Sequence, residues 1–250
     1  MIKKIALIGN QNCGKTTLFN ALTGSSQHVG NFPGVTVEQK TGFIKKHKDE
    51  LELIDLPGIY SLSPYTSEEI VSIRYLLEEK PCLIINIIDA TNMERNLYLT
   101  TQLLELNIPM ILVLNMMDEV IVSGNSIDID GLKERLEMDV VPISASKNEG
   151  IEDVITAIEK NLDQSSHHID ICHGVVHKAI HSISHIVEHS AQSLHLPLRY
   201  CVTKIIEGDE DMFDKLHIDQ GDRHIIEHIL EKMEEEAGTD REAALVDMRY

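Results

Sequence analysis

A phosphate-binding pattern lies near the start of the chain. Residues 9–16 read Gly-Asn-Gln-Asn-Cys-Gly-Lys-Thr and match Gly-x-x-x-x-Gly-Lys-[Ser/Thr], between a strand-like run at 4–8 and a helical pattern at 15–23. Glycines in such a loop let backbone N–H groups surround phosphate oxygens, and the helix N-terminus adds a favourable dipole. We therefore predict that Lys15 neutralises β- and γ-phosphate oxygens of a nucleotide and that the Thr16 hydroxyl ligates Mg²⁺.

Two further segments could complete the phosphate end of this site. Asp55-Leu-Pro-Gly58 follows the next apolar run, so Asp55 would hold Mg²⁺ through water and the Gly58 amide would sense the γ-phosphate. Residues 29–38 lie between the two motifs, where a switch loop belongs, and Thr36 is the candidate second hydroxyl ligand of Mg²⁺. Two structural alternatives stay open: Asp55 begins a simple turn at a strand end, or Thr36 begins a strand.

A third motif could read the base. Asn115-Met-Met-Asp118 closes an apolar run, and a carboxylate at Asp118 can accept both N1–H and N2–H of guanine, a donor pair that adenine lacks. Ras has Lys where this chain has Met116; Met can pack on the base, but the missing charge predicts weaker nucleotide retention. Ser144-Ala145-Ser146 resembles the GTPase loop whose backbone contacts guanine O6. The motifs and their order favour guanine over adenine.

Alternating strand-like and helical patterns would position these motifs. The strand-like runs are 5–8, 51–56, 83–88, 110–114 and 140–143, and the helical patterns are 15–23, 67–79, 95–106, 130–137 and 151–162. This alternation predicts an α/β fold, a Ras-like P-loop GTPase domain with a mostly parallel sheet that binds ligands at the carboxyl ends of its strands. Residues 36–45 interleave polar side chains and predict an antiparallel edge strand.

The pattern changes near residue 163. Residues 163–166 read as a linker, which predicts domains at 1–164 and 167–250. The second is predicted to be a small α-helical domain, because apolar residues recur at helical spacing before a break at Pro197. Those apolar residues are Val176, Ile180, Ile183 and Val187, and shorter helices are expected at about 200–207, 221–235 and 240–249.

Composition restricts the function classes. The net charge of −19 opposes adhesion to nucleic acid, so we predict no nucleic-acid partner. The four cysteines, at 13, 82, 172 and 201, form no Cys-x-x-Cys pair and indicate neither a disulfide framework nor a zinc knuckle. No run approaches the ~18 apolar residues that a membrane span needs, and the N-terminus lacks a signal-peptide pattern. We expect a soluble, cytosolic chain.

Four segments together resemble one protein family. They read Gly-Asn-x-Asn-x-Gly-Lys-Thr-Thr-Leu-Phe-Asn, Asn-Phe-Pro-Gly-Val-Thr-Val-Glu, Asp-Leu-Pro-Gly-Ile-Tyr-Ser-Leu and Asn-Met-x-Asp, and are similar to the N-terminal cytosolic region of the bacterial ferrous iron transporter FeoB. The resemblance extends, on less specific signals, through the helical region, which in the family is called a guanine-nucleotide dissociation inhibitor domain. It implies a fragment of a transporter whose transmembrane portion is absent from this chain, located at the cytoplasmic side of the bacterial inner membrane.

The motifs and the resemblance together define the predicted site. Catalytic roles fall to Asn12, Lys15, Thr36 and Gly58, while Thr16, Thr36 and Asp55 would hold Mg²⁺ and Asn12 would hold K⁺. The residues predicted to bind GTP or GDP are Asn10, Asn12, Cys13, Gly14, Lys15, Thr16, Thr17, Gly34, Val35, Thr36, Asp55, Pro57, Gly58, Asn115, Met116, Asp118, Ser144, Ala145 and Ser146.

The resemblance also implies how hydrolysis proceeds. Asn12 matches the asparagine that holds K⁺ against the phosphates in potassium-activated GTPases, although it could instead merely cap the loop. Ile59 stands where Ras has its water-positioning Gln, which predicts slow hydrolysis. Cys13 stands where the family usually has Ser, and we expect it to act only as a small replacement for that Ser. The alternative is a thiol of lowered pKa that is open to oxidation.

A row of histidines marks the helical region. His173, His177, His181, His185 and His189 recur every four residues, but each such step rotates about 40° on an α-helix, so five cannot share one ion. A solvated or partly packed helix face is the preferred interpretation, and one pair binding Zn²⁺, Ni²⁺ or Fe²⁺ is the alternative. Glu234–Glu236 are interpreted as a solvated helix end, with a cation site as the alternative.

The leading functional hypothesis is a switch that hydrolyses GTP slowly and couples its nucleotide state to iron uptake by the transmembrane portion, with a homo-oligomer possible. One alternative is a regulatory module that exchanges nucleotide without useful turnover while the histidines sense metal. Another is a ribosome-assembly or tRNA-modifying GTPase, which the net charge of −19 disfavours.

Overall fold

The computed structural model describes residues 2–24, 27–45, 47, 50–63, 66–162 and 174–249. The chain divides into two compact units, Met1–Ile169 and Asp170–Tyr250, and each is considered separately below. The predicted linker at 163–166, together with Cys172 and His173, lies outside the described residues.

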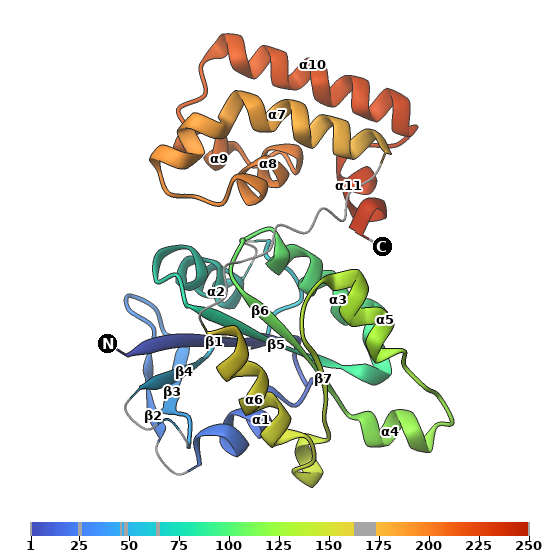
Figure 1. The fold of residues 1–250 in the computed structure, drawn as a ribbon. Helices are drawn as coiled ribbons and strands as arrows, with labels where there is room; N and C mark the ends of the chain where they lie inside the picture. The colour runs from blue at the N-terminus through green and yellow to red at the C-terminus, as the bar shows by residue number, and fades with distance from the viewer. Residues whose placement is uncertain are drawn as a thin grey trace. The chain divides into compact units, whose positions relative to one another are not determined.

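The first unit is built on a seven-stranded mixed sheet with the order β2-β3-β4-β1-β5-β6-β7 (Figure 1). Five strands are parallel: β1 (Lys3–Gly9), β4 (Leu51–Asp55), β5 (Leu83–Asp89), β6 (Met110–Asn115) and β7 (Val140–Pro142). Two antiparallel strands, β3 (Glu38–Phe43) and β2 (Gln27–Asn31), extend the sheet beyond β4. The predicted α/β fold with a mostly parallel sheet is confirmed.

The edge of the sheet differs from the sequence prediction. Residues 36–45 were expected to form the edge strand, but β3 pairs on both sides and β2 is the edge. The sequence of β2, Gln-His-Val-Gly-Asn, is polar and largely exposed, so it carries no apolar signal for a strand. Its backbone pairing with β3 holds it in place.

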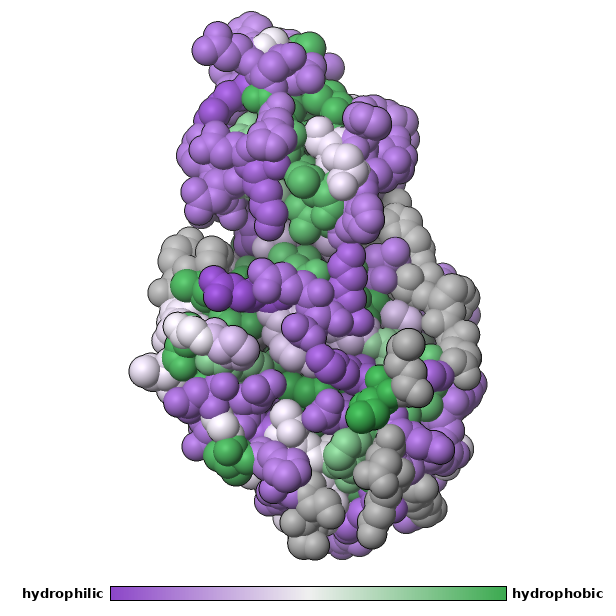
Figure 2. All heavy atoms as spheres, turned by 90° about the vertical axis from the view of Figure 1, so that its left-hand side faces the viewer, coloured by the Kyte–Doolittle hydropathy of each residue, from purple (hydrophilic) through white to green (hydrophobic). Residues whose placement is uncertain are grey.

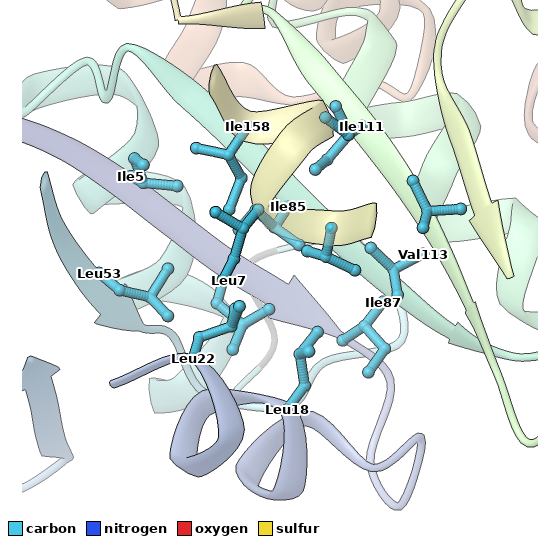
Figure 3. Close-up of a cluster of buried hydrophobic side chains, with 14 of the residues drawn as sticks. Ile5, Leu7, Leu18, Leu22, Leu53, Ile85, Ile87, Ile111, Val113 and Ile158 are labelled. Atoms are coloured by element: carbon cyan, nitrogen blue, oxygen red, sulfur yellow. The ribbon is translucent and has the colours of Figure 1, made fainter. Parts of the chain in front are cut away.

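Side chains alternate between the two faces of the sheet and bury two groups of apolar residues. On one face, Ile5 and Leu7 of β1 pack with α1 (Lys15–Thr23) and α6 (Ile151–Asn161) in the cluster that Figure 3 draws. The opposite face is covered by α2 (Ser67–Glu78), α3 (Met93–Leu104), α4 (Met117–Val122) and α5 (Ile129–Leu136). Two packed helical layers hold the strands, so the loops at their carboxyl ends have a rigid base.

The second unit is helical, as the apolar spacing predicts. It contains α7 (Gly174–Ser193), α8 (Leu198–Ile206), α9 (Glu210–Lys215), α10 (Gln220–Ala237) and α11 (Arg241–Arg249). The predicted apolar row on α7 is buried, and Pro197 stands directly before α8. The short α9 was not predicted, because only Met212 and Phe213 of its six residues face inward. Within the described ranges, no helix combines the length and apolar content that crossing a bilayer requires.

Polar residues cover most of the surface seen in Figure 2, and apolar residues appear there in small separate groups. Among the large apolar side chains that are exposed, Val122 and Ile121 at the end of α4 are 86% and 70% exposed.

Candidate nucleotide-binding site

The phosphate loop, residues 9–16, directly follows β1, and β1 lies between β4 and β5 in the sheet. Gly9 is required by close packing, since a Cβ there would lie 2.2 Å from the Ile87 carbonyl oxygen. Gly14 is required twice: its φ of 88° lies in the left-handed region, and a Cβ would lie 2.1 Å from Nδ2 of Asn115. These glycines therefore let the loop turn tightly and open α1 at Lys15.

Lys15 lies between the phosphate loop and the Asp55 loop. Its ammonium forms an ion pair with the Asp55 carboxylate, and the two side chains are 13% and 6% exposed. Burial raises the pKa of Asp55 above its ordinary value, while the nearby charge of Lys15 opposes that rise. The structure thus brings together the predicted phosphate-binding lysine and the predicted magnesium-binding carboxylate, 40 positions apart in sequence.

The loop after Asp55 runs alongside the phosphate loop. Leu56 N–H donates to the Leu7 carbonyl at 2.9 Å, and Ile59 N–H donates to the Gly9 carbonyl at 3.2 Å. A Cβ at Gly58 would lie 3.2 Å from Cγ of Gln11, so the Gly58 backbone closely approaches the phosphate loop. Pro57 beside it is half-buried. Ile59 is 2% exposed, so the residue at the position of the Ras glutamine is part of the core.

Asn115 joins the phosphate loop to the base loop, residues 144–146, which is predicted to contact guanine. Its Nδ2 donates to the Cys13 carbonyl at 2.8 Å, and its Oδ1 accepts from Ala145 N–H at 2.9 Å. The side chain is 4% exposed, and β6 carries it to the carboxyl edge of the sheet. One amide therefore sets the spacing between the phosphate loop and residues 144–146.

Asp118, at the start of α4, is held by the neighbouring loop. A hydrogen bond from Ser144 is the main reason that its pKa lies below the ordinary value, and Lys147 adds to the effect. The Lys147 ammonium lies 3.1 Å from Oδ2 of Asp118. Met116 is half-buried and has a φ of 65°, which lets it turn the chain from β6 into α4.

Lys147 was not among the predicted site residues. It directly follows Ser146 in the 3₁₀ turn Ala145–Lys147, so its position in the sequence gave a weak signal. The pairing with Asp118 depends on the β6–β7 register, which the sequence does not display.

The remaining predicted phosphate-loop residues differ in exposure. Asn12, Thr16 and Thr17 are exposed, and Asn12 has a φ of 65°. Asn10 is 2% exposed, and its amide has no hydrogen-bond partner among the protein atoms described. The oxygen donors of Thr16 and Asp55 are of the hard type that Mg²⁺ prefers.

Cys13 is fully buried beneath the loop. Its Sγ lies 2.9 Å from the point where a Cβ on Gly9 would stand. Burial raises the pKa of the Cys13 thiol to about 11 in spite of the nearby Lys15. The alternative of a reactive thiol of lowered pKa is therefore wrong, because the thiol is inside the core and not at the open face of the helix terminus.

The segment with Gly34, Val35 and Thr36 forms a separate turn between β2 and β3. Phe32 N–H donates to the Val37 carbonyl at 2.9 Å, and Gly34 has a φ of 78°. Thr36 is exposed and precedes β3, so the alternative in which it begins a strand is wrong. Within the described part of the chain, no hydrogen bond or ion pair joins Thr36 to the phosphate loop.

Phe32 anchors this turn against Tyr75 of α2. The two rings meet edge-on, with centroids 6.1 Å apart and planes at 74°. The Tyr75 hydroxyl is buried and has no hydrogen-bond partner among the protein atoms described. Burial raises the pKa of Tyr75, so the hydroxyl stays protonated.

Replacing Tyr75 with Phe is expected to stabilise the first unit by about 1 kcal/mol, because the variant no longer buries an unsatisfied hydroxyl. Urea denaturation measures the change, with Tyr60→Phe, at a residue 37% exposed, as the control expected to have no effect. A destabilised Tyr75→Phe variant would show that the hydroxyl has a partner.

The histidine row lies along α7, apart from His173. His177 is half-buried, and His181, His185 and His189 are exposed. The His181 and His185 rings are 4.6 Å apart between centroids. Across the described residues, no group of three or more His, Cys, Asp or Glu side chains is arranged to hold a metal ion. On α10, Glu234 pairs with Arg241 at 3.0 Å, and Glu236 lies 3.8 Å from Lys232 and 3.7 Å from Lys178.

Comparison with known proteins places both parts of the chain. The model of a family described as "Ferrous iron transport protein B" matches residues 3–158, and that of the "FeoB cytosolic helical domain" matches residues 173–250. A Porphyromonas gingivalis "Fe(2+) transport protein A/Fe(2+) transporter FeoB fusion protein" is 40% identical over 84% of this chain and 26% of its own length. A Salmonella typhimurium "Fe(2+) transporter FeoB" is 41% identical over 82% of this chain and 27% of its own. The chain thus spans about a quarter of these relatives' length.

Solved structures agree along the whole chain. A point mutant of S. thermophilus NFeoB bound to GDP matches with a TM-score of 0.91 and 42% identity, covering 100% of this chain and 95% of that one. NFeoB from S. thermophilus bound to GDP.AlF4⁻ and K⁺ matches with a TM-score of 0.85 and 41% identity, covering 100% and 96%.

Proposed function

This chain belongs to the FeoB family of ferrous iron transport proteins, and we propose that it is a GTP-hydrolysing switch coupled to Fe(II) uptake. The observation that carries the proposal is the Asn115 link, which joins a phosphate loop to a loop that holds a guanine-reading carboxylate. We assign the GTPase domain to residues 1–164 and the helical domain to residues 167–250.

At the phosphate end of the site, Lys15 and a bound Mg²⁺ would neutralise the negative charge of the nucleotide. Lys15 binds the β- and γ-phosphate oxygens, which compete with Asp55 for its ammonium. Bound Mg²⁺ would be held by Thr16, Thr36 and Asp55, and would neutralise charge on the phosphate oxygens. Gly58 senses the γ-phosphate through its backbone amide, which is next to the phosphate loop. Gly34–Thr36 form the switch turn, which has to move or reorder to reach the phosphates.

The other end of the site selects guanine. Asp118 accepts hydrogen bonds from N1–H and N2–H of guanine. In the 144–146 loop the Ala145 N–H is bound by Asn115 and the Ser144 N–H by the Glu149 carbonyl, so the Ser146 N–H is the group assigned to O6. The half-buried Met116 packs on the face of the base. Adenine offers the carboxylate no matching donor pair, so ATP would leave acceptor positions of the Asp118 carboxylate unfilled, and GTP is preferred.

Slow hydrolysis assisted by K⁺ fits the remaining residues. Ile59 is buried and cannot position water, so no side chain stands in for the Ras glutamine at that point. Asn12 is an exposed residue of the phosphate loop, so its amide oxygen is available to ligate K⁺. A relative was solved with GDP.AlF4⁻ and K⁺, which supports the same ion here.

GTP hydrolysis in matched KCl and NaCl buffers with Mg²⁺ tests the proposal. We expect faster hydrolysis in KCl and loss of that difference in Asn12→Ala, because the variant removes an oxygen ligand of K⁺. Asn107→Ala is the matched control: Asn107 is also exposed, has a φ of 54°, and carries the same backbone strain after substitution.

Other outcomes separate the parts of the proposal. Equal, slow rates in both salts with intact GTP binding would retain the GTPase and remove the Asn12 role. A chain that binds GTP and ATP equally would contradict the guanine site itself. The partner in this proposal is the transmembrane portion of the same transporter at the cytoplasmic side of the inner membrane, and the chain has no nucleic-acid partner.

A further inference from the structure

The guanine-reading motif of this chain has no lysine of its own. Met116 fills the position where Ras carries that lysine, so no side chain of the motif itself places a positive charge beside the Asp118 carboxylate. The structure supplies a lysine from elsewhere: Lys147, whose Nζ lies 3.1 Å from Oδ2 of Asp118. The Asp118 side chain is 19% exposed and that of Lys147 is 52% exposed.

The turn that carries Lys147 is fixed at several points. Lys147 N–H donates to the Ser144 carbonyl at 3.1 Å, and Ala145 N–H is bound by Asn115 at 2.9 Å. Asn148 follows with a φ of 58° and returns the chain to the Ser144–Glu149 bridge. The backbone of Lys147 is therefore held beside Asp118 by the same loop that is predicted to contact the base.

Lys147 can bind Asp118 without displacing guanine. An ionised carboxylate has about four acceptor positions. Ser144 and Lys147 each use one in this structure. Two positions remain, which equals the number of donors that N1–H and N2–H of guanine supply, so the lysine and the base need not compete for the same position. A cation at this point also favours the polyphosphate anion.

We propose that Lys147 is a positioning residue for guanine recognition, which orients the Asp118 carboxylate and supplies the charge that Met116 lacks. The inference rests on the proposed guanine site and extends it to a residue outside the recognised motifs. Three groups lower the pKa of Asp118: Ser144 and Lys147 from the neighbouring loop, and the backbone N–H of Asp118 itself. Both neighbours keep the carboxylate ionised.

Binding of fluorescent GDP to Lys147→Met, Lys147→Arg and Lys133→Met tests this role. We expect an affinity loss of about five- to tenfold for Lys147→Met, because a half-exposed ion pair is screened, and a change within about twofold for Lys147→Arg. Lys133→Met removes the same charge from a lysine paired with Asp130 at 3.4 Å on α5, and should bind GDP normally.

The pH profile and a double variant separate positioning from a structural effect. Removing Lys147 raises the pKa of Asp118, so the loss of GDP affinity on acidification should begin at higher pH in Lys147→Met. The second test uses the Asp118→Asn variant with xanthosine diphosphate, whose O2 can accept a hydrogen bond from the new amide. Adding Lys147→Met to this variant should cause no further loss of nucleotide affinity.

Three results would overturn the inference: unchanged or tighter GDP binding by Lys147→Met, an equal loss in Lys133→Met, or an equal loss in the Asp118→Asn background. Failure of the unmodified chain to prefer GDP over ADP would instead contradict the proposed guanine site. The two failures are therefore distinguishable.

Discussion

Replacing Asn115 with Ala is expected to lower the free energy of unfolding by about 3 kcal/mol and to weaken GDP binding by about tenfold or more. The substitution leaves the Cys13 carbonyl and the Ala145 N–H without their partner in a position that is 4% exposed. Each orphaned buried group costs about 1–3 kcal/mol. The affinity falls because the phosphate loop and the base loop lose the amide that sets their spacing.

Asn96→Ala is a matched control for this variant. Asn96 is 5% exposed, accepts from Asp89 N–H at 3.3 Å and donates to the Asn92 carbonyl at 2.9 Å, so it makes the same kind of link. It lies on α3 and joins neither loop of the site. Urea denaturation should show comparable losses in both variants, whereas only Asn115→Ala should lose GDP affinity. Equal GDP affinity in the two variants would contradict the linking role.

The general position of the site could be predicted because buried parallel strands have a clear sequence pattern. Strands such as β5 and β6 read as continuous branched apolar runs, and ligands bind where such strands end. Asp55 and Asn115 lie at strand ends as predicted for that reason, and Lys15 opens the helix that follows the loop after β1. Their mutual contacts were not predictable in detail, since they depend on strand order and register.

The features that could not be predicted from the sequence depend on tertiary contacts. The strand β2 has no apolar pattern and is held by its pairing with β3. The pKa of Cys13 depends on burial, which outweighs the nearby lysine and helix N-terminus. Lys147 reaches Asp118 across a loop whose geometry the chain spacing does not show. In each case a local signal was weak or misleading because contacts outside the segment itself decided the outcome.

Lys15→Met is expected to weaken GTP binding by about a hundredfold or more, because it removes the side chain that neutralises the phosphates. The same variant should also lose about 3 kcal/mol of stability near neutral pH, because Asp55 is left as a buried charge without its partner. The side chain of Asp55 is only 6% exposed. Fluorescent-nucleotide titration and urea denaturation measure the two effects separately.

Asp55→Asn provides the control for the stability effect. The amide has nearly the shape of the carboxylate but carries no charge, so the double variant Lys15→Met/Asp55→Asn should recover most of the lost stability. It should not recover GTP binding, since the lysine is still absent. If the double variant is as unstable as Lys15→Met, the loss comes from packing of the lysine stem and the buried charge is not its cause.

The pH dependence of the Lys15→Met penalty follows from the same pair. In the native chain the folded pKa of Asp55 is already above the ordinary value, so its contribution to stability falls as pH rises between the unfolded and folded pKa. Without Lys15, which opposes that rise, the folded pKa moves higher and the fall with pH becomes larger. The stability difference between the two chains should therefore be smaller at acidic pH, where protonation removes the buried charge, and should grow as the pH rises toward neutrality. A difference that stays constant across this range would show that Asp55 ionisation does not determine the penalty.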